Sequence, residues 1–97
     1  MSRRQVLDLL TIRKSDLCRR FRVRDVAVFG SVARDEDSPA SDVDVLVEFD
    51  GQADFDQVMD LTFYLEELLG RSVDLVTTKA LRQELREHVE REAIHVA

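Results

Sequence analysis

The sequence predicts a small α/β (α+β) domain in which a mixed β-sheet carries helices mainly on one face. Short apolar or alternating segments, typical of strands, are interleaved with longer segments whose apolar residues recur at helical spacing. The lengths of the connections favour one antiparallel and one parallel strand pair, which together make a mixed sheet. Since 97 residues can build one core but not two, we expect a single domain over residues 1–97.

The first predicted element is a helix over residues 3–21. Ser2, followed three positions later by Gln5, matches a capping box, in which each side chain bonds the backbone amide of the other residue. The apolar side chains of this segment recur at helical spacing; they are Val6, Leu9, Leu10, Leu17 and Phe21. Cys18 lies near this stripe, and we expect it to be a packing residue rather than a nucleophile.

A buried strand and a tight turn are predicted next. Residues 26–29 form a continuous apolar run, which is typical of a strand covered on both faces. Gly30 and Ser31 end this run. We expect the Ser31 hydroxyl to cap a short helical turn that starts near Val32.

The rest of the chain alternates between strand and helix patterns. Residues 42–49 and 72–77 alternate as strands do, and a helix over 55–69, ended by a glycine at the next position, lies between them. A last helix follows and ends near Ala93, and residues 94–96 add a short strand or a packed tail. The apolar stripes of the two helices are Phe55, Val58, Met59, Leu61, Thr62, Leu65, Leu68 and Leu69 in the first and Leu81, Leu85 and Val89 in the second.

The connections between strands predict how the sheet is ordered. Only about a dozen residues join strand 26–29 to strand 42–49, which favours an antiparallel pair. The helix between strand 42–49 and strand 72–77 permits a right-handed parallel crossover.

Composition and charge narrow the classes of function. The net charge is −6, but residues 1–24 carry eight basic and two acidic side chains, while the remainder carries six basic and eighteen acidic ones. An acidic protein binds nucleic acid poorly, so we expect no direct nucleic-acid partner and interpret the basic N-terminal helix as a solvated face. No apolar run approaches the length of a membrane span, no signal-peptide pattern is present, and Cys18 is the single cysteine. We therefore expect a cytoplasmic protein without a membrane partner.

Three aspartates and a glycine–serine turn carry the chemical signal. Asp42 and Asp44 lie one residue apart on a strand, so both side chains point to the same face, roughly 6.5–7 Å apart along the chain. Asp74 stands at the entry of the later strand, and its carboxylate joins the other two if the strands are neighbours. Three clustered carboxylates repel one another unless a cation lies between them.

This arrangement suits phosphoryl or nucleotidyl transfer with Mg²⁺, in the form of two ions. We expect Asp42 and Asp44 to share the metal ions, and Asp74 to hold the ion beside the attacking hydroxyl or to accept its proton. The phosphates would lie against the turn. Its glycine, Gly30, lets the backbone approach, the following serine offers a hydroxyl and an amide, and Arg34 neutralises charge.

These residues resemble a known superfamily. Gly30-Ser31, ten residues, and then Asp42-Val43-Asp44 are similar to the nucleotidyltransferase superfamily that includes DNA polymerase β. The run that opens at Ser41 and ends at Phe49, together with the tail Arg91-Glu92-Ala93-Ile94, resembles its minimal members, the MNT proteins. The resemblance covers nearly the whole chain.

The resemblance implies an antitoxin that is paired with a HEPN-domain toxin, a ribonuclease, in a hetero-oligomer. It implies transfer of AMP from ATP to a tyrosine of that toxin, with Asp42, Asp44 and Asp74 as catalytic, metal-binding acids. Gly30, Ser31, Arg34 and Ser41 would then be the cofactor-binding residues. One position departs from the family pattern: Asp35 stands where a glycine commonly follows the arginine, and its charge is expected to weaken ATP binding.

Two other functions remain open from the sequence. One is a non-catalytic antitoxin that masks the toxin by binding, with helix 54–69 offering spare apolar surface. The other is a small-molecule nucleotidyltransferase of the kind that modifies aminoglycosides; such enzymes carry an additional acceptor domain, for which this chain has no room.

Overall fold

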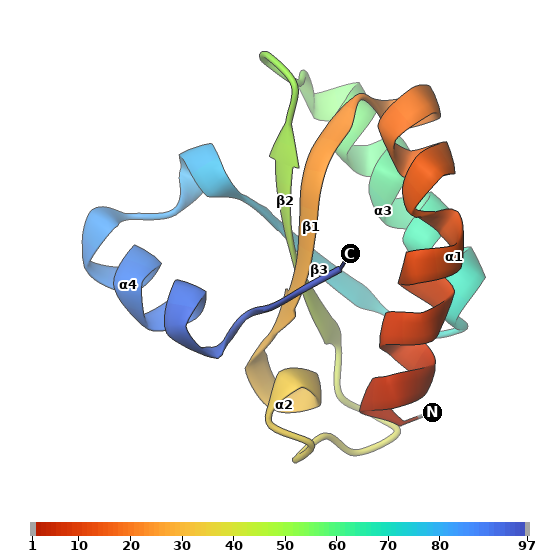
Figure 1. Cartoon of the computed structure of the whole chain (residues 1–97), viewed down its shortest axis with the longest axis vertical. Coiled ribbons are helices and arrows are strands. Elements are labelled where there is room, and N and C mark those ends of the chain that lie inside the picture. Colours follow the sequence, from red (N-terminus) through yellow and green to blue (C-terminus); the bar gives the residue numbers. More distant parts are fainter. Residues whose placement is uncertain (1, 97) are drawn as a thin grey trace.

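The computed structural model describes residues 2–96 and has a four-stranded mixed sheet with the strand order β3-β2-β1-β4 (Figure 1). The strands are β1 (Val23–Phe29), β2 (Val43–Phe49), β3 (Val73–Thr77) and the two-residue edge strand β4 (Ile94–His95). β1 runs antiparallel to β2 and to β4, whereas β2 and β3 are parallel. The predicted mixed sheet and both predicted strand pairings are confirmed.

Helices α1 (Arg3–Phe21) and α3 (Phe55–Leu69) pack side by side on one face of the sheet (Figure 1). The capping box of Ser2 and Gln5 starts α1, and a second one, from Asp54 and Gln57, starts α3. A hydrophobic core lies between these helices and the sheet; its largest fully buried side chains are Val6, Leu10, Leu17, Val26, Val28, Val32, Val43, Val45, Val47, Leu61, Leu65 and Leu69.

Helix α4 (Gln83–Glu92) covers the opposite face of the sheet, after the short 3₁₀ helix η1 (Thr78–Ala80) (Figure 1). There Val89 packs against Ala27 and Leu46, with Val76 beside them. The helices therefore lie mainly on one face, as predicted, with α4 on the other. Because side chains alternate along β2, Leu46 on the α4 side places Asp44 on that side as well.

Several local predictions were wrong. Helix α2 (Gly30–Ala33) starts one residue before Ser31, so Ser31 does not cap it, and Phe29 stands at the cap position without a side-chain bond. Strand β1 begins at Val23 rather than at residue 26, because Arg22 closes α1 in a left-handed conformation and turns the chain directly into the sheet. Three side chains predicted to pack are exposed: Cys18, Phe55 and Leu85.

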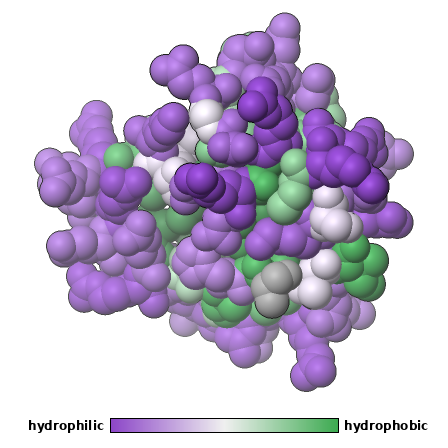
Figure 2. Space-filling model, turned by 45° about the horizontal axis from the view of Figure 1, so that its top comes forward, coloured by the Kyte–Doolittle hydropathy of each residue, from purple (hydrophilic) through white to green (hydrophobic). Residues whose placement is uncertain are grey.

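One face of the domain is mostly polar. On the face shown in Figure 2, hydrophilic side chains predominate and the hydrophobic areas are separated. Among residues 2–96, no helix combines the length and apolar character that a membrane crossing needs.

Candidate nucleotidyl-transfer site

The predicted acidic side chains come together at one end of the sheet. Asp44 on β2 is the direct neighbour of Asp74 on the parallel strand β3, and Asp42 lies immediately before β2. Asp42 and Asp74 are exposed, while Asp44 is half-buried. The chain crossover through α3 aligns the starts of the two strands, so acids distant in the sequence meet at one edge.

The surroundings at this edge of the sheet change the pKa of Asp44. Burial, followed by the nearby negative charges of Asp74 and Asp42, raises the pKa of the Asp44 carboxyl, and the positive charge of Arg34 opposes the shift. A carboxylate that is costly to ionise beside two others is stabilised by a cation between them. The three aspartates therefore give this edge of the sheet a negative charge and several oxygen atoms, which suit a hard divalent cation.

Gly30 lies against this edge because the residue opposite Asp44 across the antiparallel pair is Phe29. Gly30 has a φ of +71°, and a Cβ atom placed on it would stand 2.1 Å from the Asp44 Oδ2 atom. Glycine is thus required here for two reasons: its left-handed backbone and the space that the Asp44 carboxylate occupies. The role predicted for Gly30, close approach of a phosphate, is additional to the packing that the structure shows.

The polar groups around Gly30 are held by a carboxylate from α4. The Gly30 amide donates a 2.9 Å hydrogen bond to the Glu92 Oε1 atom. Arg34 donates to the Glu92 Oε2 atom at 3.0 Å and to Glu36 at 3.1 Å. Burial opposes ionisation of Glu92, but the Gly30 amide and the Arg34 guanidinium together hold its pKa below the ordinary value.

The predicted cofactor-binding residue Ser41 lies in the loop between α2 and β2. Its hydroxyl accepts a 3.0 Å bond from the Ser38 amide and lies 3.1 Å from the Ser38 hydroxyl. Its carbonyl accepts a 2.7 Å bond from Arg71. Ser31, the second residue of α2, is half-buried beside Gly30.

Arg71 fixes the loop that leads into Asp42. It pairs with Asp37 at 2.9 Å, and the two side chains are only 8% and 11% exposed. The same guanidinium also donates to the carbonyls of Ser38 and Ser41. The loop from residue 35 onward is therefore tied to the start of β3.

Sequence reasoning missed Arg71 and Glu92 as parts of this site. Arg71 acts across 34 residues on Asp37, and Glu92 acts across 62 residues on Gly30, so no local pattern reveals either contact. For Glu92 a signal existed: the tail that contains it was part of the family resemblance, although no role was attached to it.

Comparison with known proteins identifies the family. A family model described as a nucleotidyltransferase domain matches residues 11–96. The chain is 40% identical over 92 residues to protein adenylyltransferase MntA of Thermococcus cleftensis, covering 95% of this chain and 93% of that protein. The chain belongs to the minimal nucleotidyltransferases.

Solved structures show the same fold for minimal nucleotidyltransferases. One, described provisionally as a minimal nucleotidyltransferase, is 40% identical, has a TM-score of 0.83, and covers 97% of this chain and 95% of the other. Another is a tri-AMPylated HEPN toxin of Shewanella oneidensis in complex with MNT antitoxin. It has a TM-score of 0.69 at 20% identity, covers 94% of this chain and 71% of the other, and supports the fold alone.

To bind a metal ion at these aspartates, this minimal nucleotidyltransferase needs further ligands besides its own side chains. Within residues 2–96, no three His, Cys, Asp or Glu side chains already surround one ion position. Mg²⁺ is commonly held by one or two carboxylates together with waters and substrate phosphates. The all-oxygen set of Asp42, Asp44 and Asp74 fits that mode, with the remaining ligands supplied by a bound nucleotide.

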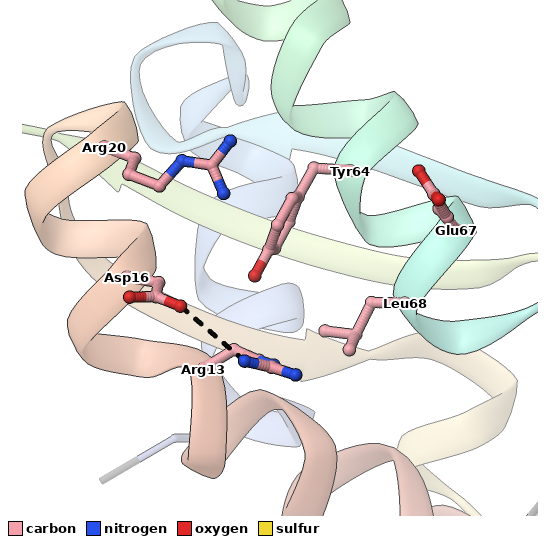
Figure 3. Close-up of a pocket in the computed structure, with 6 residues that line it drawn as sticks. All are labelled: Arg13, Asp16, Arg20, Tyr64, Glu67 and Leu68. Atoms are coloured by element: carbon pink, nitrogen blue, oxygen red, sulfur yellow. Dashed lines mark ion pairs between the residues drawn. The ribbon is translucent and has the colours of Figure 1, made fainter.

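The most spacious pocket described lies away from the acids, between α1 and α3 (Figure 3). Its volume is about 390 Å³, and it is lined by Arg13, Asp16, Arg20, Tyr64, Glu67 and Leu68. The Tyr64 ring stacks at an angle on Phe21, with 5.2 Å between ring centres, and Arg20 lies over it. Tyr64 therefore packs against the side chains of α1.

Proposed function

We propose that this minimal nucleotidyltransferase transfers AMP from ATP to a tyrosine of a HEPN-type toxin and so acts as its antitoxin. The observation that carries the proposal is the meeting of Asp42, Asp44 and Asp74 beside the Gly30 turn. It is supported by the relative named protein adenylyltransferase MntA, 40% identical over 95% of this chain. The likeness to a solved HEPN–MNT complex agrees with it at the level of the fold.

The proposed roles follow from the position of each acid. Asp42, just before β2, and Asp44, on β2, would hold the divalent ions. Asp74 is exposed on the neighbouring strand, where an incoming hydroxyl can reach it, and it would help to hold a metal ion or accept the hydroxyl proton. Mg²⁺, when bound, lowers the pKa of the attacking oxygen and offsets the charge of the phosphates.

The bond changes are those of an in-line displacement. The tyrosine oxygen forms a bond to the α-phosphorus, the bond from that phosphorus to the bridging oxygen breaks, and diphosphate leaves with the bond electrons. Gly30, Ser31 and Arg34 would bind the β- and γ-phosphates, with Ser41 at the entry of β2 beside them. These donors orient the leaving group in line with the acceptor.

The acceptor in this proposal is supplied by the partner protein. Helix α3 leaves Phe55 and Phe63 with 76% and 58% of their surface exposed, so it offers apolar contacts to a partner. The sequence left open whether the apolar residues of helix 54–69 pack in the core or face a partner.

Intact-mass spectrometry of the co-purified HEPN-type partner tests the proposal. After incubation with this chain, ATP and Mg²⁺, the partner should gain one or more AMP units on tyrosine. Asp44→Asn should slow the gain by about a hundredfold or more, the effect of removing a charge-stabilising group from a transition state. Asp8→Asn, an exposed change on α1, is the matched control and should transfer normally.

A stable complex with no mass gain in either protein would contradict the transferase proposal. It would favour the second candidate, an antitoxin that masks the toxin by binding. Mass gain on a small molecule but not on the partner would instead favour the small-molecule transferase.

A further inference from the structure

Glu92 occupies the hydrogen-bond donors that the proposed function assigns to the nucleotide phosphates. It is the last residue of α4, which approaches the site from the same face of the sheet as Asp44. One carboxylate oxygen accepts from the Gly30 amide at 2.9 Å and the other accepts from Arg34 at 3.0 Å. A carboxylate that bridges a backbone amide and a guanidinium resembles a phosphate in charge and in the donors it uses.

The surroundings show that Glu92 is held firmly as an anion. Its side chain is only 19% exposed, compared with 45% for Arg34 and 67% for Glu36, the second partner of that arginine. Both of its oxygens have a donor, and these two hydrogen bonds favour the charged form.

We propose that Glu92 competes with the nucleotide triphosphate for Gly30 and Arg34, so that this residue sets the nucleotide affinity of the free chain. The inference rests on the proposed function, in which these two groups bind phosphates. ATP then binds only after the Glu92 carboxylate swings away from the turn. Its release also loosens the last turn of α4, directly before β4.

Competition follows from the number of donors and from charge. The Gly30 amide has one hydrogen, so it cannot serve Glu92 and a phosphate oxygen fully at once. A carboxylate left in place would also stand beside the phosphates, next to the acids of the sheet edge. Like charges so close disfavour one another in a partly buried site.

The test measures ATP affinity by calorimetry, with Mg²⁺ present, for the wild type, Glu92→Gln and Glu90→Gln. Glutamine keeps the shape of Glu92 but loses the charge that holds Arg34. We expect ATP to bind Glu92→Gln about tenfold more tightly, the gain when a state populated about one time in ten becomes dominant. Glu90, which pairs only with the exposed Arg86 at 3.6 Å on the same helix, is the control and should leave the affinity unchanged.

A second readout follows the Gly30 amide in ¹⁵N-resolved NMR spectra. In the wild type this resonance should move on ATP addition, as its bond passes from Glu92 to a phosphate, and the resonances of the last turn of α4 should move with it. A Gly30 resonance that stays in place while ATP binds would show that Glu92 is not displaced.

The outcomes separate this inference from the proposed function. If the wild type binds ATP and Glu92→Gln binds it equally or more weakly, Glu92 positions the turn instead of competing for it, and the inference fails alone. If the wild type and both variants bind no ATP at millimolar concentration, the nucleotide site itself is wrong and both proposals fall.

Discussion

At the scale of single residues, the proposed site contains a carboxylate, that of Asp44, whose ionised form is disfavoured by its surroundings in the folded state. Burial and the neighbouring Asp74 and Asp42 charges raise the pKa of Asp44. Folding therefore favours the protonated form of Asp44, whereas metal binding needs the ionised form. Functional residues that oppose stability in this way are common in active sites.

This conflict predicts how stability changes with pH. Because the folded pKa of Asp44 lies above the unfolded one, the native state binds more protons between the two values, and stability falls as the pH rises through that interval. At neutral pH, without metal, Asp44→Asn should be more stable than the wild type by about 1 kcal/mol, a size typical of single stabilising substitutions. The difference should shrink as the pH falls toward 3.8, the ordinary aspartate value.

Thermal unfolding in the presence of a chelator, from about pH 4 to about pH 8, measures this difference. Asp60→Asn, an exposed aspartate on α3, is the control and should show no comparable pH-dependent gain. An Asp44→Asn variant that is less stable than the wild type at neutral pH would mean that this carboxylate supports the fold rather than straining it.

The positions of these aspartates, as distinct from their proposed roles, could be predicted from the sequence because the signals are local. Alternation along a strand placed Asp42 and Asp44 on one face, and the strand register then brought Asp74 beside Asp44. The packing reason for Gly30 was not predictable, since the Asp44 carboxylate fills the space that a Cβ at this position would need, and that depends on how β1 pairs with β2.

At the scale of elements, the loop between α2 and β2 depends on an ion pair whose side chains are 8% and 11% exposed. Arg71, just before β3, binds Asp37 and the carbonyls of Ser38 and Ser41. This contact fixes the path of the chain immediately before Asp42. It replaces the regular backbone hydrogen bonds that a helix or strand would supply at this point.

Removal of Arg71 should therefore destabilise the domain strongly. Arg71→Ala leaves the Asp37 carboxylate, which is only 11% exposed, without its partner, and we expect a cost at the lower end of the range for buried pairs, about 3 kcal/mol. Arg86→Ala breaks only an exposed pair with Glu90 and should cost at most about 1 kcal/mol. Urea unfolding of the two variants compares these costs directly.

A third variant keeps this prediction testable if Arg71→Ala does not fold. Arg71→Lys retains the charge but loses the forked geometry, so its stability should lie between those of the wild type and Arg71→Ala. Equal stabilities for the Arg71→Ala and Arg86→Ala variants would contradict the role given to this loop contact.

Features of helices and strands that depend on nearby residues were predicted from the sequence. Features that depend on contacts between distant segments were missed. The capping box of α1, the left-handed Gly70 after α3 and the parallel crossover follow from local pattern and length. Leu85 follows the helical spacing of α4 but is 53% exposed, because α4 contacts the sheet chiefly through Val89. The contacts of Glu92 with Gly30 join segments that no periodicity connects.

At the scale of the whole molecule, acids and basic groups are separated. The basic residues of the first 24 positions lie largely on α1, and the three aspartates of the proposed site lie at the starts of β2 and β3. Acidic side chains occur elsewhere too, for example Asp56 and Asp60 on α3. A divalent cation could therefore bind at several acidic regions of the surface. The proposed function requires that it bind at the edge of the sheet where β2 and β3 begin.

Paramagnetic broadening by Mn²⁺ with a non-hydrolysable ATP analogue tests this central claim most directly. Mn²⁺ substitutes for Mg²⁺ at oxygen sites and broadens the NMR signals of nearby amides. We predict that broadening is confined to Gly30, Asp42, Asp44 and Asp74 with their neighbours, and that Asp42→Asn with Asp44→Asn abolishes it. Broadening centred on α3 or on the pocket between α1 and α3 would contradict a metal-dependent nucleotide site at this edge of the sheet.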